Sequence, residues 1–210
     1  MPATAARDVV RRVAALEAGM WRSLYRWLLR RPPAPDPGTE PFGYVGVVKP
    51  MLIVFIVVSA VEIPLLDLII SRTVPWRPVR VIALAIGVYG LIWMIGLFAG
   101  LRVHPHLVGA DGLRVRSGTD VDITLPWEAV AAVRSRYRPL PSSRGVQTEV
   151  TGDGLIVNIA TGGQTSVDVV FRRPTVVRLP KGPSEPATEL RFYADEPDAL
   201  TARARQHLAA

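Results

Sequence analysis

Two long apolar stretches dominate the pattern of hydrophobic and polar positions. From Val81 to Leu101 the chain carries no charge, and Arg80 and Arg102 bracket the run. About 20 apolar residues in a helix match the roughly 30 Å hydrocarbon core of a bilayer. A buried core helix is normally shorter and has a polar face, which this stretch lacks. The pattern therefore predicts a transmembrane helix over about residues 79–102.

The earlier stretch, at about residues 48–71, is interrupted near its middle. Its helix-disfavouring or polar positions are Ser59, Glu62, Pro64 and Asp67. A carboxylate near the bilayer centre costs roughly 2.5–3.5 kcal/mol, whereas each Leu, Ile, Val or Phe returns about 0.3–0.6 kcal/mol. Summed over the run, the favourable insertion free energy of the apolar residues exceeds the cost of Glu62. The link at 71–79 is short and holds two prolines, so residues 48–103 are predicted to form an antiparallel transmembrane hairpin.

The positive charges predict an orientation. Six basic residues lie near the spans on the side of the termini: Arg30, Arg31, Lys49, Arg102, Arg114 and Arg116. The link holds three, Arg72, Arg77 and Arg80. Because loops rich in Lys and Arg stay in the cytoplasm, both termini are predicted to be cytoplasmic in a multi-pass protein of the cell membrane.

A helix is also predicted before the hairpin, over residues 1–31. Apolar residues recur there at steps of three and four: Val9, Val13, Leu16, Met20, Leu24 and Leu28. Arginines fall mainly on the other side, and Trp21, Tyr25 and Trp27 crowd the second half. This amphipathic basic helix is typical of a segment in the membrane interface, although packing on the protein's own domain or on a second copy fits the pattern too. A proline-rich linker is predicted over residues 32–47.

After Leu101 the period changes from that of a helix to that of a strand. Alternation or short apolar runs predict strands in seven places: 112–118, 123–125, 130–137, 154–160, 166–172, 176–179 and 189–193. Six or seven short strands separated by Gly-rich turns indicate a small antiparallel sandwich or barrel. A closing amphipathic helix is predicted from Asp195, as its N-cap, to Leu208. Residues 104–210 are therefore predicted to form one β-rich (α+β) domain.

Several strands closed by one C-terminal helix resemble a pleckstrin-homology-like domain. The similarity is carried by Gly112-Leu-Arg-Val-Arg-Ser-Gly118 and Ile123-Thr-Leu-Pro-Trp-Glu-Ala-Val130, and upstream by Tyr89-Gly-Leu-Ile-Trp93 and His104-Pro-His106. These residues resemble small, mostly uncharacterised actinobacterial proteins with two membrane spans and a bacterial pleckstrin-homology-like domain. The resemblance covers residues 48–205. It implies the fold and the layout, and no catalytic residues.

The composition argues against several kinds of catalytic and binding site. The chain has 25 Lys and Arg, a net charge of +7 and no cysteine, and a mean hydropathy of +0.25. Without cysteine there is no disulfide, thiolate catalysis or thiolate metal site. His104 and His106 flank Pro105, but the third histidine is His207 in the closing helix, so no metal site or cofactor is expected. The region after Leu101 lacks the basic excess of a nucleic-acid binder, and no catalytic motif is present, so the chain is not expected to be an enzyme.

Four arginines form the candidate binding site. Arg134, Arg136 and Arg138 alternate along one predicted strand, and Arg144 follows in a turn-rich stretch. Converging guanidinium groups would bind an anionic headgroup or phosphate. An ordinary solvated strand face is the alternative explanation.

Two features concern the spans. Folding the hairpin about its link sets Glu62 level with Tyr89, and the Tyr89 hydroxyl is predicted to hydrogen-bond this carboxyl. The pair is either a structural link or part of a proton or cation relay. Asp67 is expected near Arg72. The Gly96–Gly100 GxxxG pattern allows close helix packing, either as a dimer seam or against the first span.

These features favour a membrane-anchored binding or scaffold module without catalytic activity. Its expected partners are the lipid bilayer and a membrane protein or a second copy, but not nucleic acid. The alternative function is an accessory or assembly subunit of a membrane transport complex that acts through its two spans.

Overall fold

The computed structural model describes residues 17–19, 21–25, 27–29, 38–118, 120–180 and 182–209. The chain divides into two compact units. One comprises Met1–Arg30 with Lys49–Gly100, and the other comprises Arg31–Val48 with Leu101–Ala210.

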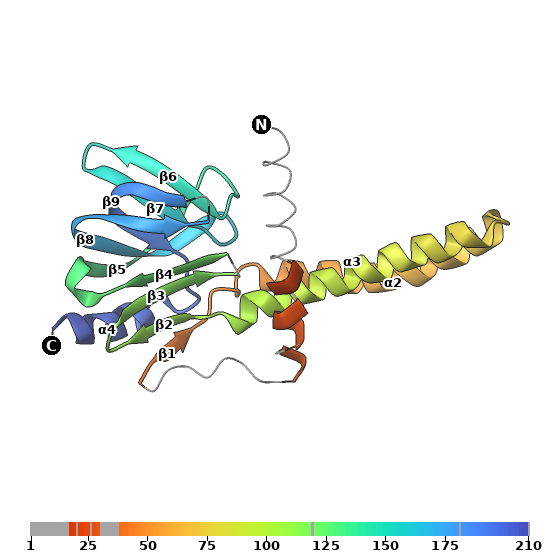
Figure 1. Cartoon of the computed structure of the whole chain (residues 1–210), viewed down its shortest axis with the longest axis horizontal. Coiled ribbons are helices and arrows are strands. Elements are labelled where there is room, and N and C mark those ends of the chain that lie inside the picture. The colour runs from red at the N-terminus through yellow and green to blue at the C-terminus, as the bar shows by residue number, and fades with distance from the viewer. Residues whose placement is uncertain are drawn as a thin grey trace. The chain divides into compact units, whose positions relative to one another are not determined.

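The helical unit contains two long antiparallel helices, α2 (Lys49–Thr73) and α3 (Arg77–Val103), which lie side by side (Figure 1). Both are long and apolar enough to cross a membrane, as the sequence predicts. The helices approach closely at Gly87, where an added Cβ would lie 3.1 Å from Cγ1 of Ile63. Near the link Arg80 forms two 2.7 Å hydrogen bonds to Asp67, so Arg80, and not the expected Arg72, is the partner of Asp67.

The described part of the N-terminal segment is helical and packs on α3. Ser23 is buried, and its Cβ lies 3.7 Å from the position of a Cβ built on Gly100. The small side chain of Ser23 thus lies against Gly100 of the GxxxG pattern. The sequence predicted a dimer seam or contact with the first span there, and not contact with the N-terminal segment. Residues 1–16, 20, 26, 30 and 31 of the predicted 1–31 helix lie outside the described residues.

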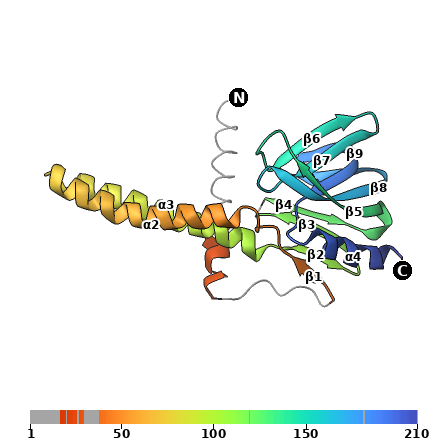
Figure 2. The ribbon, with the colours of Figure 1, turned by 180° about the vertical axis from the view of Figure 1, so that it is seen from behind.

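The second unit contains two sheets and a C-terminal helix (Figure 2). The four-stranded sheet runs in the order β1 (Glu40–Phe42), β2 (His106–Gly109), β3 (Gly112–Ser117) and β4 (Val121–Leu125). A short 3-10 helix, η1 (Trp127–Ala129), leads to the five-stranded sheet. Its order is β5 (Val130–Pro139), β8 (Gln164–Leu179), β9 (Gly182–Phe192), β7 (Gly154–Ile159) and β6 (Val146–Thr151), and helix α4 (Pro197–Leu208) closes the unit.

One apolar core serves both sheets. In the five-stranded sheet, Val133, Val169, Leu190 and Val157 lie opposite one another on successive strands and are all buried. Side chains of β3 and β4, together with Leu200 of α4, belong to the same cluster. Because side chains alternate between the faces of a strand, the neighbouring residues of the five strands point to the opposite face.

The β-rich unit with one closing helix confirms the coarse prediction, but several details of the sheets differ. The prediction of an antiparallel arrangement is wrong at one pairing, because β7 and β9 run parallel. The strands β2 and β6 were not predicted. The predicted strands 166–172 and 176–179 form one strand, β8, which passes through Pro174 at an irregularity in its pairing with β9.

The transmembrane-type hairpin is inserted between two adjacent strands. β1 precedes α2 and pairs with β2, which follows α3, with Pro41 opposite Leu107. Residues 40–47, which the sequence assigned to a linker, therefore belong to the β-rich unit. Phe42 and Tyr44 are buried there, and the Tyr44 hydroxyl accepts a 2.8 Å hydrogen bond from the Gly118 N–H.

Asp195 fastens the segment that leads into α2. Its carboxylate accepts hydrogen bonds from the N–H groups of Val45 (3.1 Å) and Gly46 (2.7 Å), and its own N–H donates to the Gly43 carbonyl at 2.8 Å. A Cβ on Gly46 would lie 2.6 Å from the carboxylate, so this approach requires glycine. The predicted role of Asp195 as the N-cap of the closing helix is wrong, since Glu196 occupies that position.

We expect Asp195→Ala to destabilise the β-rich unit by about 1–2 kcal/mol, because two backbone donors lose a charged acceptor at a partly exposed place. Thermal unfolding of the full chain in detergent micelles should show the midpoint lowered by roughly 5 °C. Glu196→Ala removes the neighbouring carboxylate and is the matched control, with little expected change. Equal midpoints for both variants would show that Asp195 does not fasten this segment.

Candidate binding site

The four arginines predicted to converge lie in different places. Arg134 lines a groove between β5 and α4, whereas Arg136 and Arg138 line a second cavity beside β6, and Arg144 lines neither. A register shift in β5 between Ser135 and Arg138 breaks the simple alternation on which the prediction relied. The structure therefore brings Arg136 and Arg138 to one cavity and places Arg134 at another groove.

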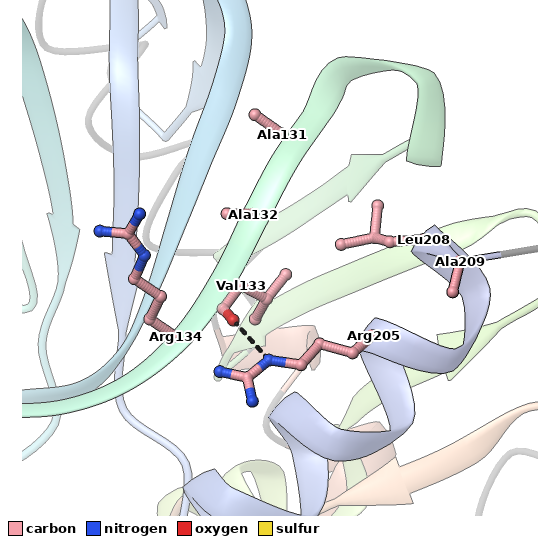
Figure 3. A pocket seen from close by; sticks show the side chains of 7 residues that line it. All are labelled: Ala131, Ala132, Val133, Arg134, Arg205, Leu208 and Ala209. Atoms are coloured by element: carbon pink, nitrogen blue, oxygen red, sulfur yellow. Dashed lines mark hydrogen bonds between the residues drawn. The ribbon is translucent and has the colours of Figure 1, made fainter.

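The groove between β5 and α4 has a volume of about 360 Å³. β5 is an edge strand, and Arg205 of α4 donates a 3.2 Å hydrogen bond to the Val133 carbonyl. Figure 3 shows that the guanidinium groups of Arg134 and Arg205 do not converge. The other side chains that line the groove are small or apolar: Ala131, Ala132, Leu208 and Ala209. Because Arg205 occupies the Val133 carbonyl, this part of the strand edge already has a hydrogen-bond partner.

The second cavity, which we call the Arg136 cavity, has a volume of about 540 Å³. It is lined by Arg136, Tyr137, Arg138, Pro139, Leu140, Pro141, Gln147, Thr148, Glu149, Asn158 and Arg191. These residues come from β5, the loop after it, and strands β6, β7 and β9. The lining thus combines charged groups, amides and apolar side chains.

A row of polar residues crosses the five-stranded sheet at this level. The register places Arg134, Asp168, Arg191, Asn158 and Gln147 opposite one another on successive strands. This row alternates with the core row and points to the other face of the sheet. An outer sheet face is normally solvated, yet Asp168 is 3% exposed, Arg191 9% and Asn158 2%. The middle of the polar row is thus enclosed.

Ion pairs hold most of the charges in this row. Arg138 donates to Asp168 at 2.7 Å, and Arg191 donates to Glu189 at 2.8 Å. Arg191 also lies 3.5 Å from Glu149 and 3.7 Å from Asp168. Burial would lower the pKa of Arg191, but these three carboxylates outweigh it and raise the pKa, so the guanidinium remains charged.

Two side chains that line the cavity, those of Asn158 and Arg136, lie outside this network of ion pairs. The Oδ1 atom of buried Asn158 accepts no hydrogen bond within the described residues. A buried acceptor without a donor is uncommon and costs free energy, so a site that retains one calls for an explanation. Arg136 is exposed, and no ion pair joins it to a carboxylate in the described part of the chain. The cavity therefore combines an exposed cation outside the ion pairs with a buried amide whose oxygen has no donor.

Sequence reasoning found Arg136 and Arg138 but missed Arg191, Asp168 and Asn158. The three lie on β9, β8 and β7. The parallel pairing of β7 with β9, which brings Asn158 beside Arg191, is not encoded in the hydrophobic pattern. A weak signal exists in retrospect: each is a polar residue with an apolar neighbour on both sides along the strand.

In the spans the structure gives Tyr89 a different partner from the predicted one. Its hydroxyl donates a hydrogen bond to Glu17 of the N-terminal segment. The contact between Gly87 and Ile63 keeps Glu62 near the level of Tyr89. Glu62 itself is exposed on α2, and no hydrogen bond of its carboxyl is formed with another described residue.

His106 lies inside the β-rich unit, where its ring packs between those of Tyr44 and Phe192. The Nε2 atom lies 2.8 Å from the Tyr193 carbonyl, and Nδ1 accepts a 3.0 Å hydrogen bond from the Arg116 N–H. These partners fit the neutral ring protonated on Nε2. Burial lowers the pKa of His106 to about 4, although the bond to Tyr193 opposes the shift. His106 thus joins β2 to β3 and to the end of β9.

Comparison with protein-family models, with curated proteins and with solved structures finds no match for this chain. The structure by itself defines the class: a chain with two helices long and apolar enough to span a membrane, attached to a β-rich unit of two sheets with a C-terminal helix.

We expect His106 to make the β-rich unit sensitive to acid. The folded pKa of about 4 lies below the ordinary 6.5, so the unfolded chain binds more protons between these values and stability falls as the pH is lowered through them. Between pH 7 and pH 5 this single group should remove about 2 kcal/mol. Thermal unfolding should show a smaller loss over this range for His106→Gln than for the wild type.

His106→Asn provides a second variant, because it also removes the buried ring and should show the same smaller loss of stability on acidification. An equal loss of stability on acidification in the wild type and in His106→Gln would contradict the assignment of a buried neutral ring.

Proposed function

We propose that this chain is a multi-pass protein of the cell membrane in which the helical hairpin anchors a pleckstrin-homology-like domain that binds a protein partner. Both termini face the cytoplasm in this proposal. Two apolar helices of sufficient length support the anchoring, and two sheets with one closing helix, α4, support the domain type. The proposed role is binding and not catalysis.

The observation that carries the proposal is the insertion of the hairpin between paired strands. The chain leaves the β-rich unit through residues 43–48 and returns to it through His104 and Pro105. At about 3.5 Å per residue the first connection spans at most roughly 20 Å, and Asp195 holds part of it in place. A domain tethered at both ends of a hairpin stays near the bilayer, as a module that recruits a partner to the membrane should.

The Arg136 cavity is the proposed docking site. It combines an exposed guanidinium outside the ion pairs, a buried amide whose oxygen has no donor, and an apolar wall from Tyr137 to Pro141. Such a mixture, with few polar groups placed around an apolar wall, is typical of sites that bind a specific ligand.

Glu62 favours a second function, that of an accessory subunit which joins a membrane complex through its spans. An ionisable group in a span normally faces other helices or a polar cavity. Glu62 is exposed on α2, and Val61 beside it is 63% exposed. A neighbouring helix of another protein would bury and hydrogen-bond this carboxyl.

Site-specific photo-crosslinking in the native membrane separates the two functions. A benzophenone amino acid in place of Tyr137, which is 57% exposed at the cavity, should give a discrete protein adduct. The same probe at Val176 serves as the matched control, because this residue is 53% exposed on β8 and does not line the cavity. It should give no adduct. Discrete adducts from a probe at Val61, with none from Tyr137, would contradict the binding-module proposal and favour the accessory subunit.

A further inference from the structure

The Arg136 cavity has a combination of groups that narrows the chemistry of its ligand. Three guanidinium groups and one carboxylate line it. Two of the three, those of Arg138 and Arg191, are already paired with Asp168, Glu189 and Glu149. The remaining cation, Arg136, is at the exposed side of the cavity. The ligand should therefore carry one negative charge for a planar guanidinium, for which a carboxylate is well suited.

The buried side of the cavity requires a second polar group. Asn158 Oδ1 is enclosed at the level of Arg191 and lacks a donor. The oxygen and nitrogen of a side-chain amide can exchange places, so this position needs either a donor or an acceptor. A peptide group supplies both an N–H and a C=O, and it satisfies the Asn158 amide in either orientation.

The third feature of the cavity is its apolar wall. Tyr137, Pro139, Leu140 and Pro141 form this wall, and Arg138 stands between the first two along the chain from β5 into the next loop. Two prolines give this wall a restricted backbone. A volume of about 540 Å³ suits a ligand of two or three amino-acid residues. The wall would accept one apolar side chain of such a ligand.

We propose that the Arg136 cavity binds the carboxyl-terminal end of a polypeptide. Arg136 would hold the terminal carboxylate, Asn158 the preceding peptide group, and the Tyr137–Pro141 wall a side chain near the terminus. The inference rests on the proposed function and deepens it, since it states which part of the protein partner docks. A phosphodiester fits less well, because it offers no donor to Asn158 and no side chain to the apolar wall.

Fluorescence anisotropy on the full chain in detergent micelles tests the proposal. The probes are fluorescein-labelled hexapeptide pools, each with one fixed carboxyl-terminal residue and random residues before it. At least one pool with a free carboxyl terminus should bind, and the same pool with an amidated terminus should bind about tenfold more weakly, equivalent to one charge-assisted contact. Equal binding of free and amidated pools, or no binding by any pool, would overturn the proposal.

Three variants locate the site. Arg136→Gln and Asn158→Val should each weaken binding of the selected pool about tenfold. Arg178→Gln removes a guanidinium from β8 that does not line the cavity, and it should leave binding unchanged. Asn158→Val should also unfold at the same or a higher temperature without ligand, because it removes an unpaired buried acceptor. A strongly lowered midpoint would show that Asn158 has a structural role and would overturn its assignment to the ligand.

Competition distinguishes a phosphate ligand from a peptide. Dibutyl phosphate, a phosphodiester with apolar groups, should not displace the bound pool at concentrations at which the unlabelled peptide does. Displacement at equal concentration would assign the cavity to a phosphate and overturn the peptide proposal. Adducts from the Tyr137 photo-crosslinker are independent of these peptides. If the adducts persist while no peptide binds, the peptide proposal fails and the binding-module function stands.

Discussion

β1 and β2 lie next to each other in one sheet although the whole helical hairpin separates them along the chain. The start of α2 and the end of α3 are therefore connected to two strands that pair with each other. Tyr44 and Asp195 then hold the segment between β1 and α2 through hydrogen bonds to Gly118 and to the Val45 and Gly46 N–H groups. The same constraint makes the β-rich unit discontinuous in sequence, since residues after the hairpin cannot complete the four-stranded sheet alone.

The polar row on the outer face of the five-stranded sheet depends on a different constraint, the register of strands that include one parallel pair. That register places Asp168, Arg191 and Asn158 side by side and encloses them. Burying a charged network normally contributes little net stability compared with an apolar face of the same shape. The ion pairs of this network hold Arg138 and Arg191, which line the proposed docking site.

The accuracy of the sequence-based predictions follows the range of the interactions involved. Hydrophobic length predicted α2 and α3 to within two residues at each end, because a span depends on composition along one segment. Alternation predicted β3 and much of β5, and the stripe of Leu200 and Ala204 predicted α4. The pairing of β1, the parallel β7–β9 contact and the bulge before Arg138 depend on residues far apart in sequence. The alternation along β5 therefore grouped Arg134 with Arg136 and Arg138, whereas the structure places Arg134 at a different groove.

In the proposed topology the hairpin crosses a membrane and the β-rich unit lies on the cytoplasmic side. The chain has no cysteine, so single cysteines can be introduced at Thr73, at the end of α2, and at Ser117, at the end of β3. In intact cells a membrane-impermeant maleimide should label Thr73→Cys and not Ser117→Cys, and both should react after the membrane is dissolved. Labelling of both sites in intact cells would contradict the membrane span, and labelling of Ser117→Cys alone would contradict the orientation.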